Sequence, residues 1–200
     1  MKQEQDYIQD IAAIRNMMER SSKFLSLSGW SGVLAGVYAL IGAGIIYFGL
    51  DVKSINFYSE TTTLYIISTA LGVLIAAIGT AVVFSKRKAS ANNASIWNST
   101  AKKMIICMAV PLVTGGLFIL ILLLHGLLAA MPTISLIFYG LSLYNAGLYT
   151  YKEIQALGII QIALGLFAFY FIDYGLVFWA IGFGIMHIIY GAYIHFKYER

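Results

Sequence analysis

The stretch that decides the fold is Gly175-Leu-Val-Phe-Trp-Ala-Ile-Gly-Phe-Gly-Ile-Met-His-Ile-Ile-Tyr-Gly-Ala-Tyr-Ile-His-Phe196. It contains no Asp, Glu, Lys or Arg over 22 residues, and a helix of that length crosses the hydrocarbon core of a bilayer. On a helix, Gly184, His187 and Gly191 share one face, because they are spaced by three and four residues. Small residues let membrane helices approach closely, so this face predicts helix packing at Gly184 and Gly191.

The rest of the chain has the same composition. Hydrophobic residues make up 60% of the 200 positions and charged residues 11%, less than half of the roughly 25% found in soluble domains. This composition excludes a soluble globular protein and makes the lipid bilayer the first expected partner. The net charge of +4 comes from basic residues that flank apolar runs, as in membrane proteins, so nucleic acid is not an expected partner.

The apolar runs predict an all-α integral membrane bundle of six transmembrane helices, preceded by an amphipathic N-terminal helix at residues 1–23. That helix is either cytosolic or lies at the membrane interface. The long run 104–151 is divided near Gly126–Pro132, where Gly and Pro favour a turn. Residues 86–103 form a hydrophilic cytosolic connector. The six predicted spans of the transmembrane domain, 24–200, are 24–50, 61–85, 104–126, 131–151, 154–172 and 175–196.

The positions of the basic residues predict the orientation. If the N-terminus is cytosolic, 12 of the 13 Lys and Arg residues fall on the cytosolic side of a six-span protein, and only Lys53 falls on the other side. An excess of basic residues marks cytosolic loops. Both termini are therefore expected in the cytosol.

Glycine spacing is a second regular feature. Fourteen of the 19 glycines fall into seven pairs whose members are seven residues apart. Heptad spacing keeps small residues on one stripe of a helix in a left-handed bundle, so it predicts close glycine packing. Gly32–Leu50 also matches Gly158–Leu176 weakly without gaps. This match is either a parallel repeat of two hairpins or a result of composition alone.

Several polar side chains are expected near the middle of the membrane. Such groups are costly in lipid unless they are paired, and they face the bundle interior. They either form a small polar pocket around His187 or hydrogen-bond neighbouring helices to one another. The six candidates are Tyr38, Thr114, Ser142, Asn145, Gln161 and His187.

The sequence predicts no catalytic, cofactor or metal site. His125, His187 and His195 lie at three different depths, so no two of them can ligate the same haem iron. The chain has no HExxH motif, no nucleophile elbow and no pair of carboxylates at mid-membrane depth. An enzyme is therefore not expected.

Two segments, Ile14–Gly29 and Phe178–Gly191, resemble those of uncharacterised small six-helix polytopic membrane proteins of bacteria. The resemblance implies a multi-pass protein of the bacterial cytoplasmic (inner) membrane. No known activity comes with it.

Together these features favour a non-enzymatic integral membrane protein whose mid-membrane polar pocket binds or passes a small solute. The alternative is a membrane-anchored regulatory or assembly subunit that acts through its N-terminal helix and the 86–103 connector. Its partner would be a membrane or cytosolic protein, and a homo-oligomer is a further alternative. The sequence identifies neither a ligand nor a partner.

Overall fold

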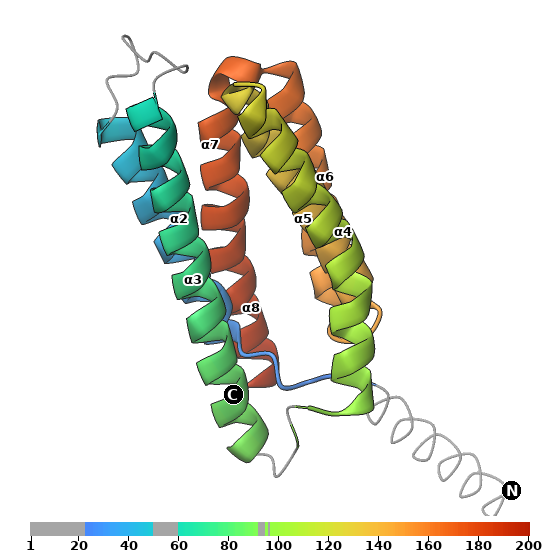
Figure 1. The fold of residues 1–200 in the computed structure, drawn as a ribbon. Coiled ribbons are helices and arrows are strands. Elements are labelled where there is room, and N and C mark those ends of the chain that lie inside the picture. The colour runs from blue at the N-terminus through green and yellow to red at the C-terminus, as the bar shows by residue number, and fades with distance from the viewer. Residues whose placement is uncertain (1–22, 50–59, 92–94, 96) are drawn as a thin grey trace, which may run out of the picture.

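A computed structural model describes residues 23–49, 60–91, 95 and 97–200 (Figure 1). The predicted amphipathic helix at 1–23 lies, except for Lys23, outside these residues. The described part of the chain contains helices and turns and no strands. Its elements are α2 (Gly29–Gly49), α3 (Glu60–Ala91), α4 (Ser99–Leu124), η1 (Leu128–Ala130), α5 (Met131–Gly147), α6 (Lys152–Tyr170), η2 (Ile172–Tyr174), α7 (Gly175–Trp179), η3 (Ala180–Met186) and α8 (His187–Tyr198).

Six of the described helical segments are long and apolar enough to cross a membrane. They are Gly29–Gly49, Thr61–Ala91, Ser99–Leu124, Leu128–Gly147, Lys152–Tyr170 and Ile172–Tyr198. The prediction of an all-α, multi-pass protein is confirmed to this extent. The exposed surface of these helices is rich in large apolar side chains such as Phe48, Ile75 and Leu124, as a lipid environment requires.

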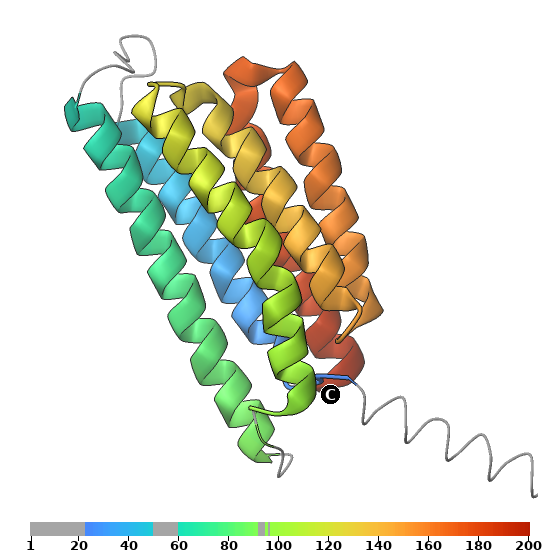
Figure 2. The ribbon, with the colours of Figure 1, turned by 45° about the vertical axis from the view of Figure 1, so that its right-hand side comes forward.

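The helices form two groups joined by the last span (Figures 1 and 2). Helices α2 and α3 pack together on one side, and α4, α5 and α6 pack in sequence on the other. The segment α7–η3–α8 lies between the groups, with α8 and η3 against α2 and α7 against α5 and α6. The last span is therefore central to the bundle.

Glycines lie where the main chains of neighbouring helices touch. A Cβ atom added at Gly191 of α8 would lie 2.5 Å from the carbonyl oxygen of Gly29 on α2. Atoms added at Gly140 of α5 and Gly158 of α6 would each lie within 2.7 Å of the other glycine's carbonyl oxygen. Real Cβ atoms do not approach so closely, so both crossings require glycine. Gly79 on α3 has open space instead, and the heptad pattern as a whole stays a prediction.

One end of the bundle carries the described basic residues. The ends of α3 and α8 and the beginnings of α4 and α6 lie together at this end, which Figure 1 shows at the bottom. We call it the basic end, because all described Lys and Arg residues belong to it: Lys23, Lys86, Arg87, Lys88, Lys102, Lys103, Lys152, Lys197 and Arg200.

An extended segment crosses the basic end ahead of α2. Residues 24–28, here called the strap, are not helical, although a span was expected from residue 24. The Phe24 amide donates to the Tyr149 carbonyl (2.7 Å), and Thr150 Oγ1 donates to the Phe24 carbonyl (2.6 Å). The ring of Phe24 is buried against Met104 and Ala146. These bonds to the α5–α6 turn replace the helical bonds that the strap lacks.

The connector between α3 and α4 is shorter in the structure than 86–103. Helix α3 continues to Ala91, and α4 begins at Ser99. The side chain of Asn98 accepts a hydrogen bond from the Ala101 amide (2.8 Å), an N-cap that fixes the start of α4. At the other end of α4, Gly126 takes φ 70°, a left-handed conformation that favours glycine in the turn to α5.

Candidate functional site

The last span is not a continuous α-helix. Residues Ala180–Met186 form a π-helix, η3, between α7 and α8, where the sequence predicted one regular helix over 175–196. In this widened stretch the Gly182 carbonyl accepts two side-chain hydrogen bonds, from Gln161 Nε2 (2.8 Å) and His187 Nδ1 (2.9 Å). A Cβ at Gly182 would clash with Gln161 Oε1 and lie 2.5 Å from Leu136 Cδ2. Glycine is therefore required for this approach.

Both ring nitrogens of His187 are used. Nδ1 lies 2.9 Å from the Gly182 carbonyl oxygen, and Nε2 lies 2.9 Å from the Tyr139 hydroxyl. A carbonyl oxygen only accepts, so Nδ1 carries the proton, and in the neutral imidazole Nε2 accepts from Tyr139. The ring is buried, with 7% of the residue exposed. A neutral His187 is thus fully hydrogen-bonded between α5 and η3.

Gln161 is the other buried member of the group. It is 0% exposed, and its Nε2 atom also lies 3.4 Å from His187 Nδ1. Its Oε1 atom has no hydrogen-bond partner among the described residues. Buried polar atoms are nearly always paired, so this one needs an explanation. We call Tyr139, Gln161, Gly182 and His187 the histidine network.

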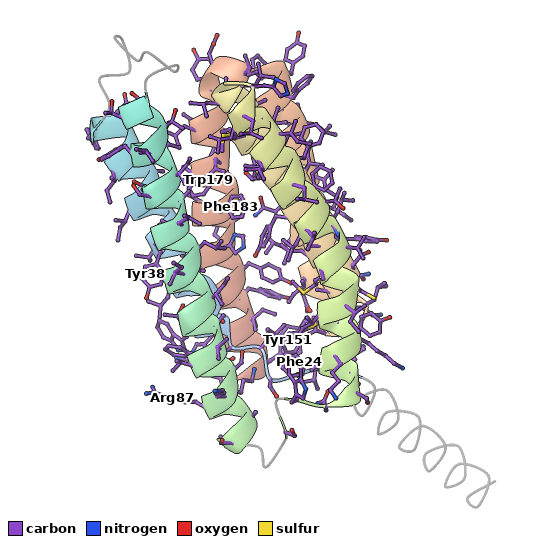
Figure 3. All side chains as sticks on the ribbon, in the orientation of Figure 1. Phe24, Tyr38, Arg87, Tyr151, Trp179 and Phe183 are labelled. Carbon is purple, nitrogen blue, oxygen red and sulfur yellow. The ribbon has the colours of Figure 1, made fainter. Side chains whose placement is uncertain are left out.

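Aromatic rings cover the histidine network. The Phe183 ring stacks on the His187 ring, with centroids 5.8 Å apart and planes at 9°. The ring centroids of Trp179 and Tyr139 lie 5.0 and 4.8 Å from the ring centroid of Phe183. Figure 3 shows Trp179 and Phe183 on the last span, on the side between the two helix groups. The network therefore sits in apolar surroundings that disfavour a net charge.

The structure brings together two of the six predicted pocket residues, Gln161 and His187. Ser142 and Asn145 instead bind helix α4: Ser142 Oγ lies 3.3 Å from the Met108 carbonyl, and Asn145 Nδ2 donates to the Cys107 carbonyl at 3.3 Å. These two bonds are contacts between helices of the kind expected in membrane bundles.

The remaining two predicted residues stand apart from the network. Thr114 is exposed and donates to the carbonyl of Val110 in its own helix (2.8 Å). Tyr38 is half-buried on α2 and makes no hydrogen bond to the network. The structure therefore does not gather all six residues around one point.

Sequence reasoning missed two members of the network, Tyr139 and Gly182. Tyrosines are enriched at membrane interfaces, so a tyrosine in the middle of the span 131–151 was the available signal for Tyr139. Gly182 contributes only its carbonyl oxygen. Every residue has such an oxygen, so the sequence does not show which one accepts a hydrogen bond from a side chain. The π-helix that presents this oxygen also left no periodicity signal.

The chemistry available at the network is limited. It offers hydrogen-bond donors and acceptors but no acid or thiol. Within the described ranges, no three His, Cys, Asp or Glu side chains lie close enough to hold a metal ion. The network therefore consists of uncharged hydrogen-bonding groups.

Fold and site together define a multi-pass, all-α protein with six apolar spans and a polar network that joins α5 and α6 to the last span. Comparisons with protein families, curated proteins and solved structures find no match for this chain. The bacterial setting implied by the sequence resemblance is not supported by these comparisons and stays a prediction.

Proposed function

We propose that this protein is a non-enzymatic integral membrane protein that binds or passes a small uncharged polar solute at the histidine network. We place it in the bacterial cytoplasmic membrane, with both termini in the cytosol. The gathering of the described Lys and Arg residues at the basic end supports this orientation, because basic residues mark the cytosolic side.

The observation that carries the proposal is the π-helix at Ala180–Met186, with its carbonyl at Gly182 turned to side-chain donors. Single π-turns within helices occur often at functional sites. Polar residues inside a membrane span are expensive and are commonly functional. A solute with an N–H or O–H donor matches the free acceptor Gln161 Oε1. A charged solute would find no opposite charge in the network.

The proposal is tested with the full-length protein in lipid nanodiscs and in proteoliposomes. Urea, acetamide and glycerol serve as neutral probes, and the readouts are the shift in thermal unfolding and the rate of solute entry. We expect at least one probe either to shift the melting temperature of the protein or to enter proteoliposomes faster than it enters protein-free liposomes. Gln161→Met, which removes the amide and keeps the length of the side chain, should abolish this response to the probe.

Thr114→Val is the matched control, because Thr114 is an exposed polar residue of a span outside the network. It should leave the solute response unchanged. If no probe gives a response, or if Gln161→Met responds as the wild type does, the solute-binding proposal is wrong.

The regulatory or assembly role remains the second candidate, and the strap is the observation that favours it. The strap follows directly after residues 1–23 and bonds to Lys88, Thr150 and Tyr151 on other elements. A partner bound to the N-terminal segment would therefore act on several helices. Deleting residues 1–20 separates the two roles: a solute-binding protein keeps its response to the probes, and an adaptor loses its protein partner.

A further inference from the structure

The buried side-chain oxygen atoms without a partner fall on one interface. Four such atoms occur in the part of the chain that the structure describes: Thr133 Oγ1, Glu153 Oε2, Gln161 Oε1 and Tyr190 Oη. Two belong to α6, one to α5 and one to α8. We call the interface of α6 with α5 and with α7–η3–α8 the α6 seam.

The lower part of the seam runs from the basic end to the histidine network. Glu153 is in the first turn of α6, and Gln161 follows eight residues later, about 12 Å further along the helix at 1.5 Å per residue. Tyr190 lies three residues after His187, about one turn nearer the basic end and on the same face of α8, and this face meets α6 where His187 Nδ1 lies 3.4 Å from Gln161 Nε2. The oxygens of Glu153 and Tyr190 therefore mark the basic end of the seam, and Gln161 Oε1 marks its middle.

Thr133 extends the seam beyond the histidine network. It is 1% exposed and lies three residues before Leu136 on the same face of α5. Leu136 Cδ2 packs against Gly182, and the carbonyl of Thr133 packs against Gly165 of α6. Thr133 is thus about one turn further from the basic end than the network.

A common cause is needed for four unpaired oxygens on a single interface, since over 90% of buried polar groups have a partner. Water is the simplest partner for all four, because each molecule both donates and accepts and commonly makes about three hydrogen bonds in a protein interior. A cation is a poorer match, because Lys197 already pairs with Glu153 through Oε1. The apolar cluster of Phe24, Met104 and Ala146 contains no such oxygen.

We propose that the α6 seam holds a file of water molecules from Glu153 at the basic end, past Tyr190 and Gln161, to Thr133. The file provides a hydrated path from one membrane surface to the histidine network. The water file does not depend on solute binding at the histidine network, so this proposal goes beyond the function proposed above.

The test is radiolytic labelling of the full-length protein in nanodiscs, with residue rates measured by mass spectrometry. Side chains beside bound water are oxidised even when they are buried. We expect His187 to be labelled several-fold faster than Met104, although the two residues are similarly buried at 7% and 6% and a thioether is the more reactive group. A His187 rate at or below that of Met104 overturns the proposal.

Two variants that remove a hydroxyl and keep the side-chain volume provide a second readout. In a hydrated seam, Thr133→Val and Tyr190→Phe each break a water bridge, so the melting temperature falls and His187 labelling decreases at least twofold. In a dry seam, the same changes remove an unpaired oxygen, so the melting temperature rises. Thr114→Val, outside the seam, should leave His187 labelling unchanged. Rising melting temperatures for both seam variants would contradict the water file.

Discussion

Lys88 Nζ lies 2.9 Å from Glu199 Oε1 and so joins the end of α3 to the residue that follows α8. Both side chains are largely buried, at 15% and 11% exposure. Lys88 also donates to the Leu27 carbonyl of the strap (2.6 Å), and Glu199 accepts from the Gly29 amide (2.8 Å). One ion pair therefore connects α2, α3, α8 and the strap at the basic end.

Glu199→Gln should destabilise the protein by about 1–3 kcal/mol, because it leaves a mostly buried Lys88 without its counter-charge. The measurement is thermal unfolding in detergent. Lys197→Met is the comparison, since Lys197 is 45% exposed although its partner Glu153 is 19% exposed, and an ion pair open to solvent on one side should contribute less than the Lys88–Glu199 pair. Equal losses for the two variants would show that Lys88–Glu199 is an ordinary surface pair.

The same carboxylate predicts a pH dependence. Partial burial raises the pKa of Glu199, but hydrogen bonds from Lys88, His195 and the Gly29 amide outweigh it and hold the pKa at about 2, below the ordinary 4.5. A pKa lowered by folding gives stability that is complete above the unfolded value and is lost as the pH falls. The difference in melting temperature between wild type and Glu199→Gln should therefore shrink below about pH 4.5. A difference that stays constant down to pH 3 would contradict the assignment.

Glycine substitutions should separate tight crossings from open faces. Gly191→Ala places a methyl group against the main chain of Gly29 and Val33, and we expect a loss of about 1–3 kcal/mol from overpacking. Gly184→Ala meets the flexible end of Leu40 and should cost less. Gly79→Ala, which meets nothing within 4 Å, should be neutral or stabilise the helix by up to about 1 kcal/mol. Melting temperatures that do not follow this order would place the contacts elsewhere.

The hydrogen bonds of His187 predict a graded response. His187→Gln keeps a donor and an acceptor and should retain most of the stability. His187→Leu should lose about 1–2 kcal/mol, because the Tyr139 hydroxyl loses its acceptor and the Gly182 carbonyl keeps only its bond from Gln161. Tyr139→Phe should cost about 1 kcal/mol for the same reason. Chemical or thermal unfolding of the four proteins provides the comparison, and a His187→Leu variant as stable as the wild type would show that the network does not hold α5 to the last span.

Orientation is tested by labelling single cysteines. In a Cys107→Ser background, a cysteine at Ser90, exposed at the basic end of α3, should react only after the membrane is permeabilised. A cysteine at Ser54, which lies between the predicted first and second spans (24–50 and 61–85), should react in intact cells. Labelling of both positions from one side would contradict the six-span topology.

The sequence predicted the six spans because uninterrupted apolar runs report membrane helices directly. It predicted the turn before α5 from Gly126 and Pro132, and the left-handed φ at Gly126 explains that success. It placed Gln161 and His187 at one depth from residue counts alone, and the structure brings them within 3.4 Å.

The remaining features depend on contacts that no local pattern reports. The strap looks like the start of a span, because Phe24–Ser28 is uncharged and apolar enough. It is extended because its main chain bonds to Tyr149, Thr150 and Tyr151, about 126 residues away. In the same way, the π-helix at Gly182 depends on a side chain of α6, which a helical pattern within the last span does not reveal.

The Lys88–Glu199 pair also sets an order of events during biosynthesis. Gly29 and Lys88 are made 170 and 111 residues before Glu199, so both must wait in the lipid or at its surface until the sixth span has been inserted. The strap can bond to Tyr149, Thr150 and Tyr151 once the α5–α6 turn has formed, but the Gly29 amide and Lys88 lack their acceptor until Glu199 is made. Closure of the basic end therefore requires the sixth span, and an assembly or quality-control factor that recognises an open end would act only before that span is inserted.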